Sequence, residues 1–174
     1  QPGDVLTISS DSSSISGRNF VVKKITSPQQ EVFGVISTQP YMIMGENVFP
    51  EDAQNSELQH NTTIIHYEGQ TYVAVGLSGR VPVKFSNSNG NIEIGDKLTS
   101  SGDGGVVKLR NSQSGQVIGI ALENSNQSDG LVEMKIENYY YTSEEEVKAM
   151  KSQLSEFQSA LCSIDNSFKF CKTK

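Results

Sequence analysis

Two aspartates in similar sequence segments are the first candidates for catalytic chemistry. Asp4 and Asp96 each follow a glycine, near the starts of the similar segments 3–10 and 95–101. Two carboxylates held close together could divide the acid and base roles of a hydrolytic reaction. An aspartate directly after a glycine is also typical of a tight turn, and this interpretation explains both positions at once. We therefore expect Asp4 and Asp96 to stabilise turns, and we do not predict a catalytic pair.

The two histidines do not indicate a catalytic or metal site. His60 and His66 are six residues apart, and no cysteine or carboxylate stands at metal-ligand spacing from them. The glycine-rich segment 101–105 precedes a Val-Val pair and not a helix, so it predicts a turn and not a phosphate-binding loop. We expect a protein without enzymatic activity, cofactor or metal. The enzymatic alternative is a self-cleaving or glycan-processing domain that uses Asp4, Asp96 or His66.

Cys162 and Cys171 are the only cysteines, and one disulfide explains them more simply than a metal site that would need further ligands. In an unbroken helix their Cα atoms would lie about 13 Å apart, whereas a disulfide requires about 7 Å or less. Either the chain turns back at residues 165–167 and closes a loop, or the cysteines pair between chains. The Asp-Asn-Ser sequence at 165–167 favours the turn. A disulfide indicates a secreted, extracellular or cell-surface protein.

Composition and charge exclude several classes of partner. The 174 residues carry a net charge of −6, so the chain lacks the basic surface that nucleic-acid binding needs. Because it has no run of about 18 apolar residues, we predict no membrane span. Asn61 and Asn126 are candidate glycosylation sites in Asn-x-Ser/Thr sequons, although such sequons arise by chance in a chain so rich in Ser and Asn.

An internal repeat is the main indication of the fold. Three segments recur in the same order: residues 3–10 as 95–101, Val21-Val22-Lys23 as Val106-Val107-Lys108, and 32–36 as 117–121. The first segments lie 92 residues apart and the later ones 85, which places seven additional residues in the loop 11–19 of the first copy. Similar strands separated by loops of different length are typical of a duplicated unit.

The repeat predicts a mainly β fold. We expect a small pseudo-twofold β-barrel or sandwich whose two halves are repeat copies at about 3–38 and 95–123, within a β-domain of residues 1–138. Gly34 and Gly119 stand inside the last strand of each copy. A glycine there predicts a bulge or a close approach of another backbone.

The segment between the copies contains a long polar stretch. Residues 46–63 show no period and are expected to form a loop, which is a candidate contact surface. A strand is expected at 64–67, and the segment 72–85 predicts two strands joined at Ser78-Gly79.

The C-terminal part, residues 139–174, predicts an amphipathic helix with a two-cysteine tail. Ser143 and Glu146 form a capping box at its start. The apolar residues then alternate in spacing between three and four: Val147, Met150, Leu154, Phe157, Leu161, Ile164 and Phe168. This seam either lies on the chain's own barrel or meets copies of itself. The stripe is narrow and polar residues surround it, which favours self-association.

Three segments, 79–84, 94–101 and 117–123, are followed by the heptad helix and its two-cysteine tail. Together they resemble the C-terminal regions of large bacterial surface proteins similar to phage tail fibres and spikes. The resemblance covers most of residues 3–171 and implies an extracellular location and a fibre-like architecture, but no reaction. Some proteins of this kind end in a self-cleaving chaperone domain, and no cleavage dyad of that kind is recognisable here.

These observations predict a non-catalytic assembly module of an extracellular or cell-surface fibre or appendage. It would form a homo-oligomer through the C-terminal helix, and a trimer would suit a fibre. The structural alternative is an extracellular filament subunit whose first ten residues add a strand to the sheet of a neighbour.

Overall fold

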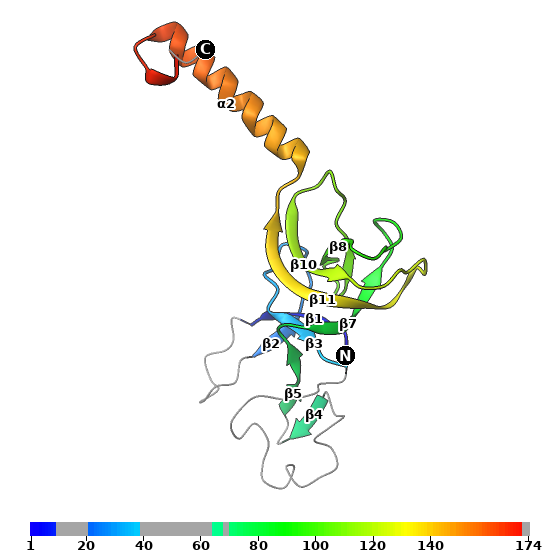
Figure 1. Ribbon diagram of the computed structural model, residues 1–174. Helices are drawn as coiled ribbons and strands as arrows, with labels where there is room; N and C mark the ends of the chain where they lie inside the picture. Colours follow the sequence, from blue (N-terminus) through cyan, green and yellow to red (C-terminus); the bar gives the residue numbers. More distant parts are fainter. Residues whose placement is uncertain (10–20, 39–63, 68–69, 172–174) are drawn as a thin grey trace.

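The computed structural model describes residues 1–9, 21–38, 64–67 and 70–171, which contain a β-rich body and one long helix (Figure 1). The helix is α2 (Glu144–Ile164), and a 3-10 turn, η3 (Lys169–Cys171), follows it. The strands are β1 (Val5–Ile8), β2 (Val22–Lys24), β3 (Gly34–Ile36), β4 (Ile64–Tyr67), β5 (Gln70–Val73), β6 (Val75–Gly76), β7 (Arg80–Ser86), β8 (Lys97–Ser100), β9 (Val106–Lys108), β10 (Gly115–Ala121) and β11 (Asp129–Tyr141). A mainly β chain with a C-terminal helix is therefore confirmed.

Several predicted features lie outside the described residues. They are the loop 11–19, the polar stretch 46–63, His60 and Asn61. His66 lies in β4, as predicted for the segment 64–67.

Five strands close into a small barrel in the order β10-β11-β7-β9-β8. Neighbouring strands are antiparallel except β7 and β9, which run parallel and pair at Phe85 and Val106. In β7, buried side chains alternate with more exposed ones, and Val81, Val83 and Phe85 are buried. The apolar residues that recur at every second position of this segment therefore point into the barrel.

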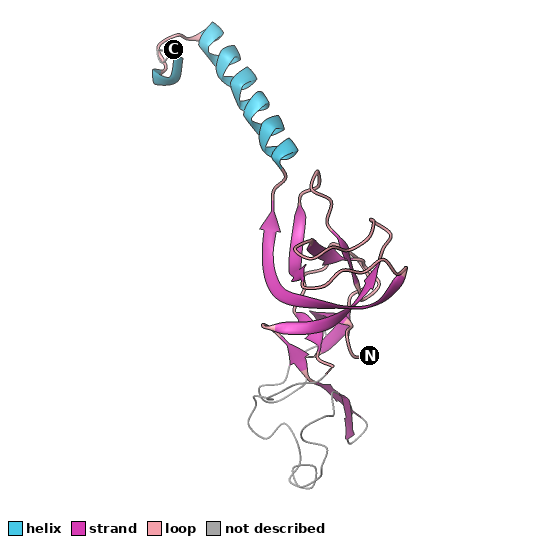
Figure 2. Cartoon of the chain, turned by 45° about the vertical axis from the view of Figure 1, so that its right-hand side comes forward, coloured by secondary structure: helices cyan, strands magenta, loops and turns pink. Residues whose placement is uncertain are grey.

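A second sheet, with the order β2-β1-β3-β6, packs against the barrel, and β4 and β5 form a hairpin (Figure 2). Val5 and Val35 of this sheet, and Ile25 directly after β2, belong to the same hydrophobic cluster as the barrel residues. Backbone hydrogen bonds also join the two sheets: Lys84 N–H donates to the Gly3 carbonyl (3.0 Å) and Val5 N–H to the Gly104 carbonyl (2.8 Å). The sheet and the barrel thus form one body.

The prediction that the two repeat copies are the halves of one barrel is wrong. The first copy supplies β1, β2 and β3 of the open sheet, whereas β8, β9 and β10 of the second copy lie in the barrel. The second unit closes because β7 pairs with both β11 and β9. Within the described residues, no strand joins β6 to β2 in the same way.

The two units nevertheless pair their strands alike. Leu6 pairs with Gly34 in the first unit, and Leu98 pairs with Gly119 in the second. The backbone bonds around the aspartates also correspond. Ile36 N–H donates to the Asp4 carbonyl and Ala121 N–H to the Asp96 carbonyl, both at 2.9 Å.

The predicted register of the middle strand is wrong by one residue. Lys24 pairs with Leu6 and Lys108 pairs with Leu98, so Lys24 and not Lys23 corresponds to Lys108. Residue numbers differ by 18 between Leu6 and Lys24 but by 10 between Leu98 and Lys108, so the first copy is eight residues longer here and not seven. Burial agrees with this register, because the buried Ile25 then corresponds to the buried Leu109. Each of them directly follows its strand.

Both strand glycines meet neighbouring strands closely, as predicted. A Cβ on Gly34 would lie 2.7 Å from the Gly76 carbonyl oxygen, and one on Gly119 would lie 2.5 Å from the Lys135 carbonyl oxygen. The pairing of β10 with β11 also shifts register between Val117 and Gly119. Only glycine fits such a close approach. The register shift between β10 and β11 at Gly119 is a β-bulge, which bends the strand pair at this point.

Candidate oligomerisation site: the projecting helix

The start of α2 is held to the barrel by two serines. The side-chain oxygen of Ser143 accepts a hydrogen bond from Glu146 N–H (3.2 Å), which is one half of the predicted capping box. The Ser143 N–H donates to the side-chain oxygen of Ser114 (2.8 Å). Ser114 directly precedes β10, and Ser143 is 2% exposed. The barrel therefore supplies the second half of the cap and sets where the helix leaves the body.

The last residue of β11 adds a second contact near this point. Tyr141 pairs with Gly115 of β10, and the Lys97 ammonium lies 4.4 Å from the centre of the Tyr141 ring. Tyr139, Tyr140 and Tyr141 are the last residues of β11, and Tyr139 and Tyr140 are exposed.

The helix projects away from the body and does not lie on it (Figures 1 and 2). None of its residues is buried. The seam is open along its length: Leu154 is 60% exposed, Phe157 71% and Ile164 84%, and Leu161 is half-buried. The alternative in which the seam packs on the chain's own barrel is therefore excluded. Most helices in proteins are stabilised by burying an apolar face. In the described part of the chain, no element covers the apolar face of α2.

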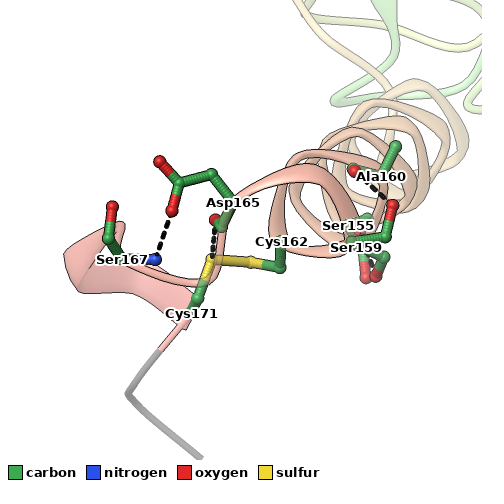
Figure 3. The surroundings of a disulfide bond; sticks show 8 residues. Ser155, Ser159, Ala160, Cys162, Asp165, Ser167 and Cys171 are labelled. Carbon is green, nitrogen blue, oxygen red and sulfur yellow. Dashed lines mark hydrogen bonds between the residues drawn. A yellow bond between two sulfur atoms is a disulfide. The ribbon is translucent and has the colours of Figure 1, made fainter.

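The far end of the helix is closed by a disulfide between Cys162 and Cys171, whose Cα atoms lie 5.7 Å apart (Figure 3). The helix ends at Ile164, and Asp165 accepts a hydrogen bond from Ser167 N–H at 2.8 Å. The backbone and hydroxyl hydrogen bonds from Ser167 lower the pKa of Asp165. This turn reverses the chain, so the predicted fold-back at 165–167 and the disulfide within one chain are both confirmed.

The reversed segment carries two aromatic rings. Phe168 and Phe170 stack with their centres 5.4 Å apart, and both remain partly exposed. Phe168 continues the heptad spacing in the sequence, but the turn takes it out of the helix. The exposed apolar surface therefore extends from the seam to the tip.

Asp4 occupies a turn and binds lysines. Its carboxylate accepts hydrogen bonds from the Gln1 amino group (2.7 Å) and from Lys84 Nζ (2.8 Å), and Lys24 Nζ lies 3.6 Å away. Burial alone would raise the pKa of Asp4, but the hydrogen bonds from Lys84 and the Gln1 amino group outweigh it and lower the pKa.

Asp96 makes similar contacts in the second unit. It accepts a hydrogen bond from Glu93 N–H (2.7 Å) and pairs with Lys108 Nζ (2.8 Å). The turn interpretation of Asp4 and Asp96 is confirmed, because each carboxylate binds the backbone nitrogen three residues earlier. Asp4 binds Lys84 of the barrel and Asp96 binds Lys108, so the two carboxylates have separate lysine partners and do not face each other as an acid-base pair would.

In the described part of the chain, no three or more His, Cys, Asp and Glu side chains gather as metal ligands would. No helix in that part is both long enough and apolar enough to cross a membrane. Asn126 is exposed between β10 and β11.

Comparisons with known proteins do not identify the chain. No protein-family model, no curated protein and no solved structure matches it.

Proposed function

We propose that this chain is a non-catalytic assembly module of an extracellular or cell-surface fibre or appendage, and that it self-associates through α2. The observation that carries the proposal is the exposed seam on a helix without buried residues. Fully burying one large apolar side chain contributes about 1.5–3 kcal/mol. Burial of the six seam residues within α2, from Val147 to Ile164, would therefore strongly favour association.

The rest of the chain supports a structural role. The body has a continuous core of its own, and its aspartates stabilise turns. The disulfide at the tip suits an oxidising, extracellular environment. We further propose that the two β-units arose by duplication, because Leu6 and Leu98 pair with glycines at the same place and Asp4 and Asp96 bind equivalent nitrogens.

Strand addition by the first ten residues is less compatible with this arrangement. β1 is an inner strand, paired with β2 on one side and with β3 on the other. Its Val5 and Leu6 are buried. Donating this strand to a neighbour would break both ladders and expose part of the core.

Molar mass measured by light scattering tests the proposal. The wild-type chain should have a mass that is a multiple of 19.0 kDa. Leu154→Glu with Phe157→Glu places two charges in the seam and should give a monomer, since a buried unpaired charge is strongly unfavourable. The matched control, Ser152→Glu with Ser155→Glu, adds the same charge outside the seam and should keep the oligomer. A monomeric wild-type chain at about 100 µM would show that the proposal is wrong.

A further inference from the structure

We infer that the partner of α2 is a second copy in parallel and in register, with Glu146 of one helix paired to Lys151 of the next. This inference rests on the proposed self-association. It adds the orientation: all β-bodies lie at one end of the bundle and all disulfide tips lie at the other.

The charges beside the seam fit this orientation. Glu146 directly precedes the seam residue Val147, and Lys151 directly follows the seam residue Met150. In parallel coiled coils, a residue placed like Glu146 faces the residue five positions later on the neighbouring helix. That residue is Lys151. The next pair along the seam is Gln153 with Gln158, which is uncharged.

Neither charge has a partner on its own helix. Stabilising pairs within a helix are three or four residues apart, and no acidic residue stands at those distances from Lys151. In the described part of the chain, neither the Glu146 carboxylate nor the Lys151 ammonium makes a hydrogen bond or ion pair. The Glu146 carboxylate is free because its usual target in a capping box, the Ser143 N–H, is bound by Ser114.

The shape of the two helix ends also favours parallel packing. In an antiparallel pair of full length, Ile164 of one copy would lie opposite Val147 of the other. The folded-back tip 165–171 would then lie close to the body of the other copy, because Val147 is about 6 Å along the axis from Ser143, where the helix begins. In a parallel bundle the tips meet each other instead, and the exposed Phe168 and Phe170 can pack together.

Cross-linking through an introduced cysteine tests the orientation. In a parallel, in-register bundle, residue 147 lies beside its own copy, so Val147→Cys should form a covalent dimer on oxidation with copper-phenanthroline, seen on a non-reducing gel. The control Ser152→Cys points away from the seam and should not. An antiparallel pair would place residue 147 near residue 164 and give no such dimer. An oligomer by light scattering without the Val147→Cys dimer would therefore overturn this inference, whereas a monomer would instead overturn the proposed function.

Charge reversal tests the pairing itself. Lys151→Glu sets two like charges against each other and should raise the dissociation constant about fivefold, an effect of the size of an exposed ion pair. Adding Glu146→Lys should restore the wild-type value. The control that adds Glu145→Lys to Lys151→Glu makes the same change of charge at a position away from the seam and should not restore it. Equal recovery in both double variants, or recovery in neither, would show that Glu146 and Lys151 do not pair.

Discussion

The β-body and α2 differ in how far their apolar residues are buried. In the body, Leu98, Val83 and Val132 are fully buried, and both sheets share one core. In α2, the large apolar side chains are exposed or at most half-buried, and none is buried. The body therefore buries its core residues within one chain, whereas the helix leaves its apolar seam exposed.

The two regions meet through few contacts, so they should respond independently to mutation. The hydrogen bonds between Ser114 and Ser143 and the strand end at Tyr141 hold the helix to the barrel. Residues that are distant and share no partners usually have additive effects. A change in the body should therefore alter unfolding without altering association, and a change in the seam should do the reverse.

The largest difference is expected between two leucines. Leu98→Ala leaves a cavity in the barrel and should lower the free energy of unfolding of the body by about 2–5 kcal/mol. Leu154→Ala in the seam should leave that free energy nearly unchanged when the protein is dilute enough to be monomeric. Urea titration followed by tyrosine fluorescence measures both. A large loss from Leu154→Ala in the monomer would show that the helix packs on the body.

Asp4 should give an intermediate effect through its ion pairs. Asp4→Asn removes charge-assisted hydrogen bonds to Lys84 and Gln1 and should lower the free energy of unfolding by about 1.5–3 kcal/mol near neutral pH. The pKa of Asp4 is lower in the folded chain than its ordinary value of 3.8. Its contribution is therefore present above pH 3.8 and is lost as the pH falls through the folded pKa.

The pH dependence supplies the control for Asp4. Wild type and Asp4→Asn should differ most in stability at neutral pH and should converge in acid. Thermal melting of both proteins between pH 2 and pH 7 measures this difference. A constant difference over the whole range would mean that the loss comes from packing and not from the carboxylate charge.

The helix and its tip could be predicted from sequence because their signals are local. Heptad spacing, the Ser143 cap and the turn at 165–167 each depend on residues within a few positions of one another. The barrel closure could not be predicted in this way, since the parallel pairing of Phe85 with Val106 joins two strands that no turn connects directly. Ser114 was missed because nothing distinguishes it from the other polar residues of its turn.

In the repeat, identical residues of the two copies do not occupy equivalent positions in the structure. Both copies contain Val-Val-Lys, and matching those letters gives a register that is wrong by one residue. The structure instead matches Ile25 to Leu109, because both are buried next to their strands. Side chains alternate between the two faces of a strand, and matching the letters would place the exposed Lys24 at the position of the buried Leu109.

The smallest effect on the body is expected from loss of the disulfide. Cys162→Ser with Cys171→Ser opens a short loop whose closure contributes about 2–3 kcal/mol to the tip. Unfolding of the body should not change, because the tip lies at the far end of α2 (Figure 1). Hydrogen exchange should therefore accelerate at residues 165–171 and remain as in wild type in β7 and β10.

The same variant separates the two pairings that the cysteines could make in an oligomer. Because the bond lies within one chain, the molar mass by light scattering should be the same with and without reductant, and the same in the double-serine variant. An oligomer that dissociates in reductant would show that the cysteines join different chains in solution. Association would then depend on the tip, and the seam from Val147 to Ile164 would no longer be sufficient to explain it.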